Sequence, residues 1–239
     1  MSNALGYNTF NLSLRYPDGV NFRGAVYWNG NGLNGPVGGP GTYTVRMTVG
    51  SNPPQTQTVR VRKDPRTTAS DADVNEQVKF LLRIRDTVSA ANNAVRTIRN
   101  VRYKLDSLRP LVTGAPSAAF TRAAKALDDS LTLTENELYQ TKNRASEDPL
   151  NYPIRINNQI GALSGFVASG ERRPPQQAYD VWNTLVPQLN AQLLRLKRQL
   201  AAQLPPVNAA LKTAGQSEIV PSTDELGAVA GRGGRGRGG

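Results

Sequence analysis

The stretch VNEQVKFLLRIRDTVSAANNAVRTIRNVRYKLDSL (residues 74–108) decides the fold, because its apolar residues repeat every seven positions and neither glycine nor proline interrupts them. Two such series run along it, offset by three positions: Leu81, Val88 and Val95, and Ile84, Ala91, Ile98 and Leu105. Ser70 and Asp73 precede the stretch at the spacing of a helix-capping pair. The sequence therefore predicts one long helix that ends near Arg109-Pro110.

Three more apolar stripes at helical spacing follow, and links that contain glycine or proline separate them. The stripes are Phe120, Ala124, Leu127, Leu131, Thr134, Leu138 and Thr141; then Ile156, Ile160, Leu163 and Val167; then Ala178, Trp182, Leu185, Leu189, Leu193, Leu196 and Leu200. We expect Ser117 to cap the second helix, Pro187 to kink the fourth, and Pro205-Pro206 to end it before a short last turn. Short links between antiparallel neighbours predict an up-down four-helix bundle over residues 67–213.

Residues 1–66 show the two-residue alternation of half-buried β-strands. The alternating segments are residues 10–14, residues 43–49 with Tyr43, Val45, Met47 and Val49 on one face, and residues 56–62 with Val59 and Val61 inward. We count about four strands, whereas a complete immunoglobulin-like sandwich has about seven. The sequence therefore predicts an α+β fold, in which a partial immunoglobulin-like β-sandwich precedes the helical bundle and needs cover for its edges.

The composition limits the chemistry of the chain. Its 239 residues include no cysteine and no histidine, which excludes disulfides, cysteine nucleophiles and the commonest general base. The formal net charge of +11 predicts attraction to nucleic acid, acidic proteins or anionic lipid head groups. The chain has no run of about 18 apolar residues, so no transmembrane helix is predicted, and its first ten residues lack the features of a signal peptide.

The glycine-rich stretch WNGNGLNGP (residues 28–36) fits the spacing G-x-G-x-x-G of dinucleotide-binding turns. Such a turn must open a helix, but here a run of glycines and prolines follows. We therefore interpret residues 29–41 as a loop between strands and predict no cofactor. The loop is instead a candidate contact with a protein partner, since tryptophan is favoured at interfaces; the contact residues would be Trp28, Asn29, Asn31 and Leu33.

The positions of the acidic residues indicate structural roles rather than metal binding or acid–base catalysis. Asp71, Asp73 and Glu76 lack the spacing of a calcium loop and suit the start of a helix, so no metal site is predicted. Four others lie off the apolar stripe of the second helix, which predicts a solvated face: Asp128, Asp129, Glu135 and Glu137. We therefore expect neither an enzyme nor a small-molecule substrate.

The end of the first predicted helix is basic, with Arg96, Arg99 and Arg102 close together. These side chains could follow a phosphate backbone, form a solvated face, or bridge to acidic residues on the second helix. The sequence leaves these three interpretations open.

Residues 214–239 read as a tail that ends in Gly-Arg repeats with Arg232, Arg235 and Arg237. Nothing in this segment can form a core, so we predict a disordered basic tail. Similar repeats occur in RNA-binding segments. Three charges without interleaved aromatic residues favour a solubilising or docking role over RNA binding.

Five phrases of the sequence resemble a known family when they are taken together. They are LRYPDGVNFRGAVYW, GPVGGPGTYTVRMTVG, VRKDPR, LYQTKN and DPLNYPIRINNQIGAL, in that order along the chain. They resemble the C-terminal region of large secreted bacterial proteins with BNR-type propellers, of the sortilin-like or glycosyl hydrolase-like kind. The resemblance implies a small β-sandwich, a helical region and an extracytoplasmic location. The propeller's Asp-box pattern is absent, so the resemblance carries no enzymatic activity to this chain.

These observations favour a non-catalytic structural or protein-interaction module. The preferred hypothesis is an accessory extrinsic subunit that docks onto protein partners in a larger cell-envelope or membrane complex. An anionic membrane surface is a further candidate partner. It would be periplasmic or extracytoplasmic and peripheral to the membrane; a cytoplasmic location is the alternative. Two other hypotheses are a nucleic-acid-binding protein that uses the basic helix and the tail, and a detached C-terminal part of a larger hydrolase-like protein.

Overall fold

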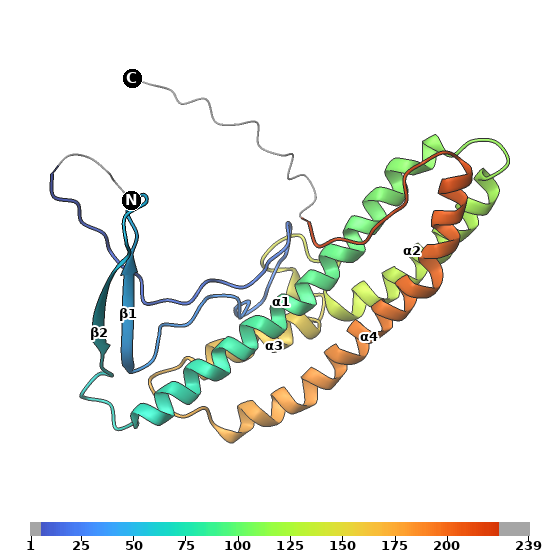
Figure 1. Cartoon of the computed structure of the whole chain (residues 1–239). Coiled ribbons are helices and arrows are strands. Elements are labelled where there is room, and N and C mark those ends of the chain that lie inside the picture. The colour runs from blue at the N-terminus through green and yellow to red at the C-terminus, as the bar shows by residue number, and fades with distance from the viewer. Residues whose placement is uncertain (1–5, 225–239) are drawn as a thin grey trace.

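The computed structural model describes residues 6–224 and shows a helical bundle with a small β-hairpin beside it (Figure 1). The elements in chain order are β1 (Gly41–Met47), β2 (Gln55–Val61), α1 (Asp71–Leu108), the 3₁₀ helix η1 (Arg109–Leu111), α2 (Ser117–Leu138), the 3₁₀ helix η2 (Asp148–Leu150), α3 (Ile156–Val167) and α4 (Gln176–Thr213). The predicted α+β class is confirmed. No helix within the described residues has the length together with the apolar surface that a bilayer crossing requires.

Helix α1 runs through the bundle because its buried face is continuous from Val74 to Leu105. It begins as predicted: the Asp73 N–H donates to Ser70 Oγ at 3.1 Å, and the Ser70 N–H donates to Asp73 Oδ2 at 3.2 Å. The hydrogen bond from the Ser70 hydroxyl holds the pKa of Asp73 below its usual range. Both predicted apolar series face the core, where only Leu81 is less than fully buried.

The other three helices pack against α1 and against one another, and they bury the predicted stripes. Helix α2 lies along α4, and α3 lies along α1 (Figure 1). Phe120, Leu131 and Leu189 are among the side chains that fill the space between the helices. One detail of the prediction is wrong: Ser117 is the first residue of α2 and makes no capping hydrogen bond, because Pro116 occupies the N-cap position.

Helix α4 does not end at Pro205-Pro206, which corrects a second prediction. It continues through both prolines to Thr213 (Figure 1). A proline inside a helix costs about 3 kcal/mol. The turns around the two prolines bury Leu204, Val207 and Leu211, and burial of each such side chain contributes about 1.5–3 kcal/mol. Packing against the bundle therefore offsets the cost of the prolines, which local propensity alone does not reveal.

The segment after α4 corrects a third prediction, because the expected tail over residues 214–239 does contribute to the core at its start. Ile219 is 1% exposed and belongs to the hydrophobic core. Its N–H donates to Asn208 Oδ1 at 2.9 Å, and its carbonyl accepts from Asn208 Nδ2 at 3.1 Å. The predicted contact residues Arg232, Arg235 and Arg237 lie outside the described residues.

Strands β1 and β2 form a two-stranded antiparallel hairpin that stands apart from the helices (Figure 1). The prediction of about four strands is wrong for the described residues: residues 10–14 are irregular, and Arg15 pairs with Val37 only in an isolated bridge. Pro36 and Pro40 flank that bridge and carry no N–H, so the pairing cannot extend into a ladder. Without further strands the predicted sandwich is not formed, and Val59 stays 40% exposed where burial was expected.

An irregular segment, residues 18–36, crosses the bundle, and we call it the strap. Its backbone groups bond to side chains of α1: the Val20 N–H donates to Ser89 Oγ at 2.9 Å, and Asn92 Nδ2 donates to the Val20 carbonyl at 2.8 Å. Phe22 and Leu33 of the strap belong to the same hydrophobic core as the helices. Irregular backbone can lie against a core only when its polar groups are paired, so these helix side chains determine where the strap lies.

The contact between the strap and α3 depends on a glycine. A Cβ atom at Gly161 would lie 2.6 Å from the backbone oxygen of Asn31, whereas a Cβ atom at Gly165 in the same helix would meet nothing within 4 Å. We expect Gly161→Ala to lower the free energy of unfolding by about 1–3 kcal/mol through overpacking. Gly165→Ala should raise it by up to about 1 kcal/mol, because alanine is the better helix former.

Urea unfolding of both variants, followed by circular dichroism, measures the difference. Equal effects of the two substitutions would contradict the close contact between the strap and α3.

Candidate protein-docking site

The glycine-rich loop is a packed part of the strap. Asn158 of α3 holds it with three hydrogen bonds: Oδ1 accepts from the Trp28 N–H at 2.7 Å, and Nδ2 donates to the carbonyls of Trp28 and Gly30 at 2.8 and 3.2 Å. Gly30 and Gly32 adopt positive φ angles of 94° and 67°, and Gly32 lies against Gly161. The loop therefore lies on α3, and strand β1 rather than a helix is the next element after it.

The four predicted contact residues of this loop lie in different environments. Leu33 is 4% exposed and packs in the core, so its prediction as a partner contact is wrong. Asn31 is half-buried, and its Oδ1 accepts from the Leu33 N–H at 2.9 Å. Trp28 and Asn29 are exposed, and Asn29 has a positive φ of 54°. Contact with a partner thus remains a prediction for Trp28, Asn29 and the accessible part of Asn31.

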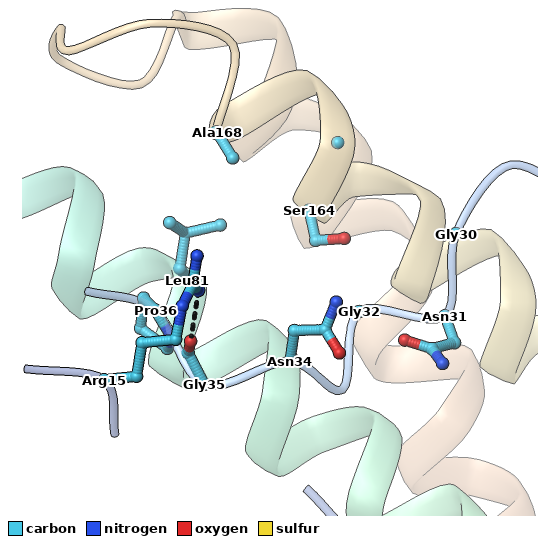
Figure 2. A pocket seen from close by; sticks show the side chains of 11 residues that line it. Arg15, Gly30, Asn31, Gly32, Asn34, Gly35, Pro36, Leu81, Ser164 and Ala168 are labelled. Atoms are coloured by element: carbon cyan, nitrogen blue, oxygen red, sulfur yellow. Dashed lines mark hydrogen bonds between the residues drawn. The ribbon is translucent and has the colours of Figure 1, made fainter. Parts of the chain in front are cut away.

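A cavity of about 440 Å³ opens beside the loop, between α1 and α3 (Figure 2). Three of its polar side chains, Arg15, Asn31 and Ser164, make hydrogen bonds within the chain, whereas the Asn34 side chain makes none among the described residues. The Arg15 guanidinium donates to the Gly35 carbonyl at 3.1 Å, and the Ser164 hydroxyl donates to the Gly161 carbonyl at 2.7 Å. Within residues 6–224 no group of three or more acidic side chains is placed to hold a metal ion. The polar groups that the cavity presents are thus mainly the side-chain amides of Asn31 and Asn34.

The basic end of α1 forms ion pairs with α2. Arg99 Nε donates to Glu135 Oε1 at 2.8 Å, Arg102 Nε donates to Asp128 Oδ1 at 2.6 Å, and Arg102 also pairs with Glu135 Oε2. Of the three interpretations that the sequence left open, the bridge between the helices therefore describes Arg99 and Arg102. Arg96 is half-buried, and its Nε has no hydrogen-bond partner among the described residues. Arg99 and Arg102 therefore hold α1 to α2.

The prediction of a solvated face on α2 is wrong for Glu135. Glu135 is only 4% exposed, because two arginines lie on it and the Arg99 guanidinium also stacks over the ring of Phe22 at 4.7 Å. Asp129 and Glu137 are exposed as predicted, and Asp128 is half-buried. The sequence could not show this, since the helical pattern placed Glu135 off the apolar stripe.

The hairpin has two chemically different faces. The pairing places Tyr43 opposite Val59, and Val45 and Met47 project from the same side; we call this side the apolar face. The other side presents threonines and arginines: Thr42, Thr44, Arg46, Thr56, Thr58 and Arg60. Neither strand packs extensively against a helix, and Met47 and Val59 are 46% and 40% exposed. The apolar face is thus uncovered along much of its length.

A groove runs between this hairpin and the preceding chain. Residues 12–17 form one wall, β1 with Val59 of β2 forms the other, and the cavity between them measures about 440 Å³. Leu12, Leu14 and Tyr16 are all exposed large apolar side chains. The alternation at residues 10–14, which predicted a half-buried strand, therefore belongs to this exposed apolar wall.

The groove is basic as well as apolar. Arg15 and Arg46 line it, and no acidic residue does. Residues 6–63 carry six basic side chains and a single acidic one, Asp18. Arg46 and Arg60 form no ion pair with any residue that the structure describes. The apolar face and the groove together form the candidate docking site, and Arg46 lies at its edge.

No family model, curated protein or solved structure matches this chain.

The ion pairs between α1 and α2 give a stability prediction. Glu135→Gln removes the carboxylate that pairs with Arg99 and one of the two that pair with Arg102, and both guanidinium groups are partly buried, so the free energy of unfolding should fall by about 3 kcal/mol. Asp129→Asn on the same helix breaks only the exposed pair with Lys125 and should change it by less than about 1 kcal/mol. Thermal and urea unfolding of both variants checks this, and a loss below about 1 kcal/mol for Glu135→Gln would show that the pairs do not hold the helices together.

Proposed function

We propose that this protein is a non-catalytic protein-interaction module, in which the helical bundle is the scaffold and the hairpin docks onto a protein partner in a larger assembly. The observation that carries the proposal is the uncovered apolar face of a two-stranded sheet. A lone hairpin in water is only marginally stable, and an apolar face normally packs against another element. A partner that covers this face would supply the missing layer.

Burial energies support this role. A partner that covers Val45, Met47 and Val59 would gain about 1.5–3 kcal/mol for each side chain that it buries fully. Exposed apolar surface of this kind marks interaction sites in folded proteins. The walls of the groove, with Leu12, Leu14 and Tyr16, extend the same surface beyond the hairpin.

The non-catalytic part of the proposal rests on the chemistry of the side chains. The chain contains neither histidine nor cysteine. Two acidic side chains of α1 and α2 have structural tasks: the buried Glu135 bridges the two helices, and Asp73 caps α1. A nucleic-acid-binding role is less well supported, because Arg99 and Arg102 already pair with carboxylates.

The proposed setting is the cell envelope, with the protein as an accessory extrinsic subunit of a larger complex. The basic surplus supports attraction to an acidic surface. The resemblance to C-terminal regions of secreted bacterial proteins supports an extracytoplasmic location. The hairpin supports the proposed contact with a partner, and it carries no information about the compartment.

Photo-crosslinking from the two faces of the hairpin tests the docking role. A photoreactive amino acid at Val59 reports on the apolar face, and the same amino acid at Thr58 reports on the opposite face of the same strand. In native extracts we expect a discrete crosslinked protein from position 59 and little or none from position 58, because only the apolar face is to be covered. Mass spectrometry identifies the crosslinked product.

The control is the same pair of positions after Val45→Asp, which places a charge on the apolar face and should abolish the crosslink from position 59. No discrete product from position 59, or equal products from both positions, would count against the docking role.

A further inference from the structure

We infer that the groove between residues 12–17 and β1 binds an extended acidic segment of the partner protein, which adds to the sheet as a third strand along β1. This inference rests on the proposed function, because it names the chemistry of the partner at the same site. Three features carry it: the open edge of β1, the spacing of the apolar side chains, and the charge of the groove.

The outer edge of β1 has unpaired backbone groups. Among residues 6–224, no backbone hydrogen bond joins β1 to any segment other than β2. The preceding chain does begin to pair in the antiparallel sense: the Gly38 N–H donates to the Leu14 carbonyl at 2.8 Å, and the Tyr16 N–H donates to the Pro36 carbonyl at 2.9 Å. This pairing stops before β1, because Pro40 has no N–H to continue it. The backbone groups on the outer edge of β1 therefore stay open, although residues 14–16 and 36–38 directly before β1 do pair with each other.

The spacing of the side chains around the groove suits a strand. Every second residue of an extended peptide points to the same side, and the groove presents apolar side chains to both sides of such a peptide. Leu12 and Leu14 line one wall, while Tyr43, Val45 and Val59 line the other. Recognition by strand addition takes affinity from main-chain hydrogen bonds and specificity from such alternating side-chain contacts.

The charge of the groove defines the partner further. Arg46 lies at the groove on β1, the strand whose edge is open, and its side chain projects from the face opposite Val45. Arg15 also lines the groove, although its guanidinium donates to the Gly35 carbonyl, and Arg60 and Arg62 are further basic residues on and directly after β2. None of the residues that line the groove is acidic. A peptide with Asp or Glu between its apolar residues would therefore meet complementary charge, whereas a basic peptide would be repelled.

Two other occupants fit less well. Lipid tails cannot bond to the free N–H and C=O groups of a strand edge, and such groups are costly in a hydrocarbon environment. A second copy of this chain would bring its own surplus of basic residues against the same surface, which opposes association. An acidic strand from a different protein satisfies the backbone, the apolar walls and the arginines together.

Selection from a displayed library of random nine-residue peptides on the full chain tests the inference. We expect enriched peptides in which apolar residues alternate with Asp or Glu. A synthetic peptide of the enriched sequence should bind at least tenfold more weakly once alternate backbone amides are N-methylated, because methylation removes strand donors and keeps the charge. Arg46→Glu should weaken binding at least tenfold, while Lys197→Glu on the exposed side of α4 should leave it unchanged.

Several results would overturn the inference. These are the absence of any enriched peptide, enrichment at helical spacing or of basic sequences, and equal binding of the N-methylated peptide. Binding of the chain to phosphatidylglycerol vesicles that is lost in Val59→Asp, without any peptide binding, would assign the surface to a membrane instead. The failures are distinguishable: a crosslink from position 59 to a helical or basic partner segment overturns the acidic strand and leaves the docking function, whereas no crosslink at all removes the docking function itself.

Discussion

The side-chain amide of Asn158 is the contact on which the N-terminal third of the molecule depends. It accepts from the N–H of Trp28 and donates to the carbonyls of Trp28 and Gly30, so one side chain replaces the hydrogen bonds that a strand or helix would have given this backbone. Next to it, Gly161 lets the Asn31 backbone reach the surface of α3. An irregular segment can lie on a core only when its polar groups are satisfied in this way.

A polar cluster extends the same attachment toward α1. The Tyr27 hydroxyl donates to Asn92 Oδ1 at 3.0 Å, and Asn157 Nδ2 donates to the same oxygen at 3.2 Å. Burial raises the pKa of Tyr27 above its usual value, so the phenol stays a neutral donor. Asn92 and Asn157 are fully buried and belong to different helices. The strap is thus attached rigidly, whereas the hairpin that follows it is held mainly at its base, where Asn75 Nδ2 donates to the Pro40 carbonyl at 3.0 Å.

Much of the helical architecture could be predicted from the sequence, because each helix carries its own periodic signal. The seven-residue repeat and the Ser70–Asp73 cap specified α1, and the stripes of the other helices are buried as expected. The failures share a cause: they depend on contacts between distant residues. Nothing local indicates that Leu204 and Val207 keep α4 helical through two prolines, or that Glu135 lies under two arginines.

The candidate site was only partly predictable for the same reason. Alternation in residues 43–49 correctly indicated β1, but alternation cannot distinguish a face that the chain covers from one that it leaves open. The same pattern in residues 10–14 therefore suggested a strand, although the prolines at positions 36 and 40 prevent the ladder that would hold it. Leu33 was misassigned because a leucine in a glycine-rich loop gives no local indication that the loop packs on a helix.

Met47 gives the apolar face a chemical property of its own. The chain contains two methionines and no cysteine, and the other methionine is Met1, so Met47 carries the sole sulfur atom among residues 6–224. Its side chain is 46% exposed on the face that a partner would cover. Oxidation of a thioether gives a polar sulfoxide, and reductases restore the original side chain. Among the described residues, oxidation of a thioether would therefore strike the apolar face alone, where one added oxygen atom makes this surface more hydrophilic and touches no part of the helical core.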